Sequence, residues 1–214
     1  MKTLLLMRHA KSSWKDSELA DHDRPLNKRG KKDAPRMGVL LQEKELVPQR
    51  ILCSSALRSR ETAQAVTENS DFSGEIVYLD RLYMAETDEF LAVLRELPDS
   101  LERVMIIGHN PGLETLLQTL SGRIESLPTA VLAHLTLQSS SWAELNGEVT
   151  GEVLEIWRPK ELLHEADSPK EKAKDKDKPK EKEKVKEKEI VKPKAKDKGK
   201  GKEKDKKEKK KKDK

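Results

Sequence analysis

Two histidines and two arginines stand where short apolar runs of the sequence end. Arg8 and His9 follow the apolar run that begins at Thr3, His109 follows a second such run, and Arg58 lies just after a third. Runs of this kind are typical of buried strands, and open α/β sheets bind ligands at the carboxyl ends of their strands. Four basic side chains at one edge would repel one another unless an anion lay between them. A phosphoryl group suits this pattern, because arginine donates paired hydrogen bonds to phosphate oxygens.

The sequence lacks the ligand patterns of common metal sites and the motifs of two other hydrolase classes. Its five histidines have no close paired spacing such as H-E-x-x-H, and Cys53 is the only cysteine. The spacing of Cys53 from Arg58 and Arg60 does not fit the loop with which cysteine phosphatases wrap a phosphate. Ser54 and Ser55 lack the G-x-S-x-G pattern of a nucleophilic serine. We therefore predict a site that needs no metal and no other cofactor.

The order of the apolar segments predicts an α/β fold. Short runs alternate with segments of helical period, which favours a single three-layer domain with a mostly parallel central sheet and helices on both faces. The last two strands leave no room for a helix between them, so we expect them to form an antiparallel pair. Strands are predicted over residues 3–7, 50–53, 75–79, 104–108, 132–137 and 152–157.

Four helices are predicted between these strands. One begins near Asn27, with Pro35 as a kink or as its true first turn, and a second runs from after residue 55 to about residue 68. The third has Thr87 as its cap. The fourth has Asn110 as its N-cap and Pro111 in its first position.

Charge divides the chain into a body and a tail. Residues 1–164 hold 20 Lys and Arg against 25 Asp and Glu, whereas residues 165–214 hold 24 against 14. The tail alternates Lys with Glu or Asp and has almost no apolar residue to bury, so neither a helix nor a strand gains from forming. We predict a folded domain over residues 1–160 and a disordered Lys/Glu-rich tail over residues 161–214.

An ordered set of short motifs resembles the histidine phosphatase superfamily and, within it, the SixA-like phosphohistidine phosphatases. The resemblance spans about residues 3–158, and Ala10 stands where most superfamily members have glycine. The motifs are Met7-Arg8-His9-Ala10-Lys11-Ser12, Asp23-Arg24-Pro25-Leu26-Asn27 with Arg29-Gly30, Ser54-Ser55-Ala56 with Arg58 and Thr62-Ala63, Gly108-His109-Asn110-Pro111-Gly112, and Pro128-Thr129-Ala130.

The resemblance implies a role for each basic residue of the site. His9 would attack phosphorus and carry the phosphoryl group as a covalent phosphohistidine, which water then hydrolyses. Arg8, Arg58 and His109 would hold the phosphoryl oxygens and stabilise the charge of the transition state. Substrate contacts are expected from Arg24, Ser12 and Asn110.

Two assignments at the rim have alternatives in the sequence. Glu86, just before the third predicted helix, is the candidate general acid, although a solvated carboxylate in the first turn of a helix would look the same. Arg24 completes the phosphate site in one interpretation and forms a salt bridge with Asp21 or Asp23 in the other.

The resemblance also implies a protein substrate. Superfamily members that act on sugar phosphates usually carry an added helical segment over the pocket, and the connections between the predicted strands leave little room for one. A P–N bond to imidazole also needs less help from an acid than a P–O bond. We expect a metal-independent phosphohistidine phosphatase acting on histidine-phosphorylated protein, with a small-molecule phosphomonoesterase of the same superfamily as the alternative.

A different class of function would reside in the tail. Lysine-rich segments bind acidic surfaces or nucleic acid, although the interspersed acids dilute the field of this tail. If the body is the enzyme, we expect the tail to make only weak contacts with acidic surfaces. Truncation after His164 separates the two hypotheses, because it leaves turnover unchanged if the body is a phosphatase. The apolar run 4–7 is too short for a signal peptide, and a single cysteine suits a reducing compartment, so we expect a cytoplasmic protein that enters no membrane. We also expect it to be a monomer.

Overall fold

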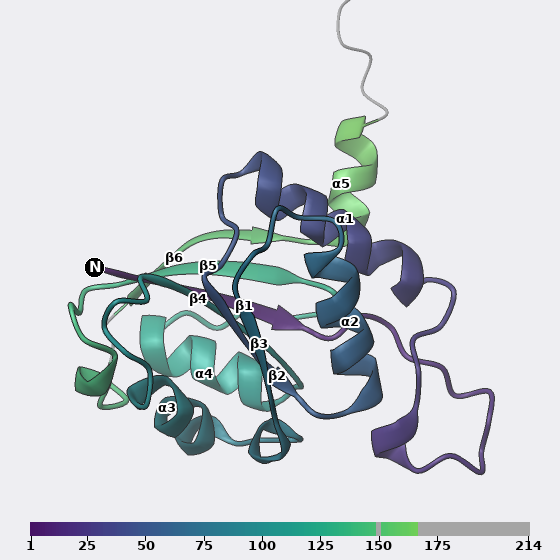
Figure 1. The fold of residues 1–214 in the computed structure, drawn as a ribbon, viewed down its shortest axis with the longest axis horizontal. Coiled ribbons are helices and arrows are strands. Elements are labelled where there is room, and N and C mark those ends of the chain that lie inside the picture. Colours follow the sequence, from purple (N-terminus) through teal and green to yellow (C-terminus); the bar gives the residue numbers. More distant parts are fainter. Residues whose placement is uncertain (149–150, 167–214) are drawn as a thin grey trace, which may run out of the picture. The chain divides into compact units, whose positions relative to one another are not determined.

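The computed structural model describes residues 1–148 and 151–166, and these form one α/β domain (Figure 1). The segment predicted to be a disordered tail lies outside the described residues from position 167 onward. Among the residues described, no helix is both long enough and apolar enough to cross a membrane.

A six-stranded mixed sheet is the centre of the domain, in the order β3-β2-β4-β1-β5-β6. The first four strands of the sequence pair in parallel, whereas β5 is antiparallel to β1 and to β6. All six predicted strands and the antiparallel final pair are therefore confirmed. The strands are β1 (Lys2–Arg8), β2 (Arg50–Ser54), β3 (Glu75–Leu79), β4 (Arg103–Gly108), β5 (Leu132–Leu137) and β6 (Gly151–Trp157).

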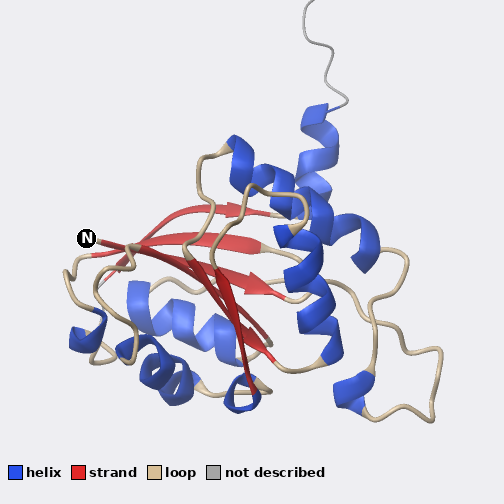
Figure 2. Cartoon of the chain, in the orientation of Figure 1, coloured by secondary structure: helices blue, strands red, loops and turns tan. Residues whose placement is uncertain are grey.

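Helices cover both faces of the sheet, which confirms the three-layer arrangement (Figure 2). One face packs against α1, α2 and α5 through a core that includes Met37, Leu41 and Val66, and the other packs against α3 and α4 through a core that includes Phe90 and Leu116. The helices are α1 (Gly30–Glu43), α2 (Leu57–Thr67), α3 (Thr87–Arg95), α4 (Gly112–Ser121) and α5 (Pro159–Ala166), with short 3-10 turns η1 (Asp21–Asp23), η2 (Asp80–Leu82) and η3 (Trp142–Glu144).

The strand register places the two histidines side by side. Arg8 of β1 pairs with Gly108 of β4, so the next residue of each strand, His9 and His109, leaves the same edge of the sheet. The backbone N–H of His9 donates to the Gly108 carbonyl oxygen at 3.1 Å and extends this pairing by one residue. Because α1 and α4 leave these central strands toward opposite faces, the two histidines lie where open α/β sheets form a crevice.

Three predicted helix starts need correction. Asn110 does not cap α4: Pro111 is the residue before its first position, Gly112, while Nδ2 of Asn110 donates to the Leu127 carbonyl oxygen and its Oδ1 accepts no bond within the described residues. Thr87 is the first residue of α3 rather than its cap, and no side-chain cap bond is present at Glu86 before it. Helix α1 begins at Gly30, three residues after Asn27, whose side-chain oxygen accepts from the Gly30 backbone N–H.

Helix α5 crosses the predicted domain boundary at residue 160. It runs from Pro159 to Ala166 and so extends into the segment predicted to be the tail. Leu162 is partly buried and packs against the same core as Met37 and Leu41. This apolar contact gives the start of the charged segment a reason to fold.

Candidate functional site

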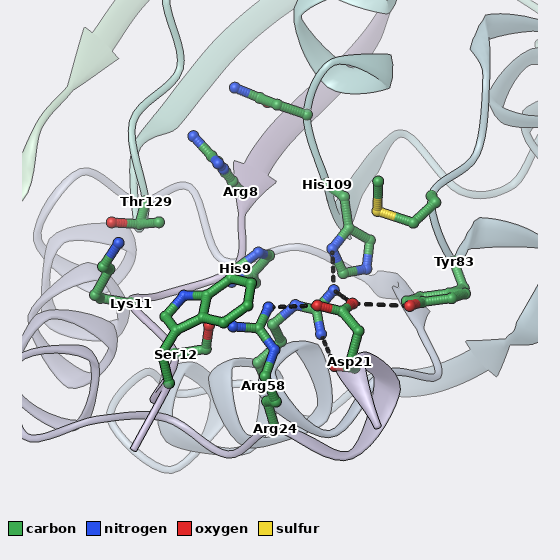
Figure 3. A pocket seen from close by; sticks show the side chains of 13 residues that line it. Arg8, His9, Lys11, Ser12, Asp21, Arg24, Arg58, Tyr83, His109 and Thr129 are labelled. Carbon is green, nitrogen blue, oxygen red and sulfur yellow. Dashed lines mark hydrogen bonds and ion pairs between the residues drawn. The ribbon is translucent and has the colours of Figure 1, made fainter. Parts of the chain in front are cut away.

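A cavity of about 440 Å³ opens at the carboxyl edge of the central strands. Figure 3 shows that His9, Arg24, Arg58 and His109 lie together although they come from separate parts of the chain, and Arg8 lines the same cavity. The structure thus brings together the four residues that the strand ends singled out. The three predicted substrate contacts, Arg24, Ser12 and Asn110, line the same cavity.

The His9 side chain is held as a neutral imidazole with one nitrogen free. Its Nδ1 lies 2.8 Å from the Ala10 carbonyl oxygen, which can only accept, so Nδ1 carries the proton and Nε2 keeps its lone pair. Burial, together with the charges of Arg58, Arg8 and Arg24, outweighs this hydrogen bond and lowers the pKa of His9 to about 4. At neutral pH the free nitrogen is therefore a competent nucleophile.

His109 is neutral as well, and its ring is fixed at both nitrogens. Nδ1 accepts from Nη2 of Arg58 at 3.3 Å, so Nε2 carries the proton and donates to the Ser54 hydroxyl at 2.8 Å. Burial first, and then the neighbouring His9 and Arg58, lowers the pKa of His109 to about 3. The two imidazole rings lie with their centroids 5.0 Å apart, which leaves both in reach of one small ligand.

Arg58 is fixed against a carboxylate that sequence reasoning did not assign to the site. Its Nη2 lies 2.9 Å from Oδ2 of Asp21, and its Nη1 donates to the Asp21 carbonyl oxygen at 2.5 Å. The Tyr83 hydroxyl donates to the same Oδ2 at 2.8 Å. Burial alone would raise the pKa of Asp21, but the Tyr83 hydrogen bond and the charges of Arg58 and Arg24 together lower it.

Arg24 combines both roles that the sequence left open. It pairs with Oδ1 of Asp21 at 2.6 Å and also lines the cavity. Its guanidinium carbon lies 3.4 Å from the centroid of the Trp14 ring, so the exposed indole packs over it. Although Arg24 is buried, its Nε and Nη1 have no hydrogen-bond partner within the described residues.

Arg8 and Asn110 are oriented by one backbone group. Nη1 of Arg8 and Nδ2 of Asn110 both donate to the Leu127 carbonyl oxygen, at 3.0 and 2.9 Å. Nε of Arg8 and Oδ1 of Asn110 are buried and lack partners among the described residues. Burial, only partly offset by Glu114, lowers the pKa of Arg8. Unpaired buried donors in a cationic cavity indicate a site shaped for an anion.

Glu86 lies outside this cavity. It is exposed and lines a neighbouring cavity of about 450 Å³ at the start of α3 and α4, and Met84 borders both cavities. Gly112 keeps these segments close, because a Cβ on it would lie only 2.0 Å from the Ala85 carbonyl oxygen. The assignment of Glu86 as the proton donor stays a prediction.

Asp21 and Tyr83 have little or no signal in the sequence that marks them as part of the site. Asp21 stands three residues before Arg24 and was considered as its ion-pair partner, but its bond to Arg58 depends on how the connection between β1 and α1 folds back. Tyr83 follows the short η2 turn and carries no motif that marks it. Within the described residues, no three His, Cys, Asp or Glu side chains gather as a possible metal site.

Comparisons with known proteins identify a family. The family model described as histidine phosphatase superfamily (branch 1) matches residues 4–89. An uncharacterised chloroplastic protein of Arabidopsis thaliana is 34% identical over 152 residues, which cover 67% of this chain and 70% of the relative. An uncharacterised protein of Mycobacterium tuberculosis is 32% identical over 150 residues, which cover 65% of this chain and 91% of the relative.

A solved structure of similar fold carries a related description. A crystal structure described as a candidate phosphohistidine phosphatase SixA from Agrobacterium tumefaciens is 28% identical to this chain, with a TM-score of 0.64. The similarity covers 74% of this chain and 98% of that protein. The shared region therefore spans nearly the whole of the solved structure.

Proposed function

Because the chain belongs to the histidine phosphatase superfamily, we propose that it removes phosphate from histidine-phosphorylated protein through a covalent phosphohistidine on His9. The observation that carries this proposal is the state of His9. A buried, neutral imidazole whose Nδ1 is bonded to the Ala10 carbonyl oxygen offers Nε2 to a phosphorus atom in a cavity of cations.

The first chemical step transfers the phosphoryl group to His9. Nε2 of His9 forms a bond to phosphorus while the P–N bond of the substrate breaks, and the leaving imidazole, protonated beforehand by solvent on its other ring nitrogen, departs as a neutral ring. Arg8, Arg58 and Arg24 surround the position of the phosphoryl oxygens and offset their negative charge. Water then attacks phosphorus, inorganic phosphate leaves, and His9 returns to its neutral form.

Binding of the phosphoryl group would rearrange the charges around Asp21. In the free site this carboxylate is the counter-ion of Arg58 and Arg24, at 2.9 and 2.6 Å. A phosphoryl dianion makes shorter and more numerous bonds to the same guanidinium groups. We therefore assign Asp21 the role of a temporary anion that holds the arginines in place and gives way to the substrate.

His109 would gain a proton at the same step. Its Nδ1 faces the cavity side of Arg58 and accepts a hydrogen bond in the free site, whereas a phosphoryl oxygen needs a donor there. A nearby dianion favours the charged imidazole and raises its pKa. His109 then donates to the phosphoryl oxygen while Ser54 keeps the ring oriented through Nε2.

The rim of the cavity favours a large substrate over a small metabolite. Trp14 is 71% exposed and Met84 is 52% exposed, and both border the opening. Exposed apolar side chains around a charged pocket are typical of a surface that receives another protein. The similarity to a structure described as a SixA phosphohistidine phosphatase supports the same substrate class.

A competition experiment tests the substrate class. The full chain is given a histidine-phosphorylated protein together with a panel of sugar phosphates and other phosphomonoesters, with and without EDTA. We expect the phosphoprotein to have the higher kcat/KM and EDTA to change nothing. Preference for one metabolite by about tenfold, or about 1.4 kcal/mol of transition-state binding, would support the small-molecule alternative. Loss of turnover in EDTA that a divalent ion restores would reject metal independence.

A further inference from the structure

A basic cavity lies beside the catalytic cavity, at the start of α1. Its volume is about 490 Å³, and no carboxylate lines it. Four of its lining side chains are cations, and all four are exposed. They are Lys15, Lys28, Arg29 and Lys31.

One stretch of extended chain separates the two cavities. Ser12 and Trp14 line the catalytic cavity, whereas Ser13 and Lys15 line the basic one. This alternation is that of a strand, and Ser12 does form an isolated antiparallel bridge with Leu26. A ligand that spans the thickness of one backbone can therefore occupy both cavities.

The positive charge of the basic cavity is poorly compensated by the fold. Within the described residues, Lys15, Lys28 and Lys31 form no ion pair, and Arg29 shares Asp33 with Arg36. Cations at the start of a helix also oppose its dipole, which favours acidic residues there. The stability of α1 therefore gives no reason for this cluster, whereas binding of an acidic ligand does.

The basic cavity differs in charge from most of the domain. Residues 1–164 carry more acidic than basic side chains, so most of the domain repels an acidic partner. The basic cavity is an exception placed directly next to the catalytic opening. Its lysines are exposed and not fixed by partners, which suits a variable row of carboxylates better than one small anion.

We propose that the basic cavity docks an acidic stretch of the substrate protein next to its phosphorylated histidine. This inference rests on the proposed function and adds to it the charge of the surface that surrounds the substrate histidine. The phosphohistidine side chain enters the catalytic cavity past Trp14, while carboxylates of the same protein contact Lys15, Lys28 and Lys31.

Two synthetic peptides of equal length test this inference on the full chain. Each carries one phosphohistidine, flanked by glutamates in one peptide and by lysines in the other. At low ionic strength we expect kcat/KM to favour the acidic peptide by about tenfold or more, the lower end of electrostatic steering effects. High salt should remove the preference, because it screens exposed charges.

A pair of matched double variants locates the effect. Lys28→Glu with Lys31→Glu should remove or reverse the preference for the acidic peptide. Lys44→Glu with Lys160→Glu changes the net charge equally at exposed lysines outside the basic cavity, and should keep the preference. Both variants should hydrolyse p-nitrophenyl phosphate at the rate of the unmodified chain, because this small ester needs only the catalytic cavity.

Three outcomes contradict the inference. The first is equal kcat/KM for the two peptides. The second is an equal loss of the preference for the acidic peptide in both double variants. The third is a loss of p-nitrophenyl phosphate hydrolysis in the Lys28 and Lys31 variant that is as large as its loss of peptide hydrolysis. If neither peptide is hydrolysed while the small ester is, the proposed phosphohistidine activity itself fails, and the docking inference fails with it.

Discussion

The catalytic cavity and the cavity next to it on the other side of Met84 have almost the same volume but opposite charge. The first, of about 440 Å³, has Arg8, Arg24 and Arg58 on its wall, whereas the second, of about 450 Å³, has Glu86 and Asp88. The arginines are buried or partly buried and keep unpaired donors within the described residues, while the two acids are exposed.

Charge and burial, rather than size, are therefore the properties by which we assign the active site to the first cavity. Burying a cation without a full set of partners costs free energy, so a fold keeps such a group when a ligand repays the cost. The carboxylates of Glu86 and Asp88 in the second cavity carry no such free-energy cost, because they are exposed and water solvates them. The predictions below change one property of the cationic cavity, or of its acidic neighbour, at a time.

Loss of the nucleophile should have the largest effect. We expect His9→Ala to abolish turnover of every phosphorylated substrate, because His109, the other neutral imidazole that lines the cavity, has both ring nitrogens in hydrogen bonds and offers no free lone pair. The check is kcat on p-nitrophenyl phosphate and on a phosphohistidine peptide, with circular dichroism to confirm folding. Residual turnover within tenfold of the unmodified chain would contradict the role of His9.

Removal of one phosphoryl-binding group should have an intermediate effect. Arg58→Ala and His109→Ala should each lower kcat by about 10²–10³, the range seen when one donor to a transition state is lost. The measurement is steady-state kinetics on the same two substrates. A rise in KM with kcat unchanged would assign the group to ground-state binding instead.

Neutralising Asp21 should strengthen anion binding. In the unmodified chain, the Asp21 carboxylate lies 2.6 Å from Nη2 of Arg24 and 2.9 Å from Nη2 of Arg58. In Asp21→Asn this negative charge is gone, so inorganic phosphate no longer competes with a carboxylate for the two arginines. We expect the Kd of phosphate to fall by about tenfold, the equivalent of about 1.4 kcal/mol. Isothermal titration calorimetry measures this directly. A weaker affinity would show that Asp21 orients the arginines more than it competes with the ligand.

Parallel strands explain why most of the site could be predicted from the sequence. Arg8, His9 and His109 each end or follow an apolar run, and adjacent parallel strands bring such ends together without further information. The roles of loops could not be predicted in this way. Asp21 enters the site because the connection between β1 and α1 folds back over Arg58, and no local pattern encodes that return.

The positions of Asn110 and Glu86 could not be predicted from the local sequence either. Asn110 has the right type and position for an N-cap, but the distant Leu127 carbonyl oxygen competes for its side chain. Glu86 is close in sequence to Tyr83, which contacts Asp21, yet it turns into the neighbouring cavity. For Asn110, a tertiary contact overrides a correct local preference.

Removal of the Glu86 carboxylate should have the smallest effect. Glu86→Gln should lower kcat/KM on a phosphohistidine peptide by less than about tenfold, because a protonated imidazole leaves without strong acid assistance. If Glu86 is the proton donor, the loss should be larger on an alkyl phosphate than on p-nitrophenyl phosphate, whose leaving group needs no proton. If Glu86→Gln hydrolyses each of the three substrates at the rate of the unmodified chain, Glu86 is rejected as the acid.

Trapping of the covalent intermediate tests the central claim most directly. The full chain is mixed with a labelled phosphohistidine protein, quenched within milliseconds in base, and digested for mass spectrometry. We expect acid-labile, base-stable phosphate on His9 and no label at that position in His9→Ala. Turnover without labelled His9 at any time point, or label on another residue that His9→Ala retains, would contradict covalent catalysis by His9.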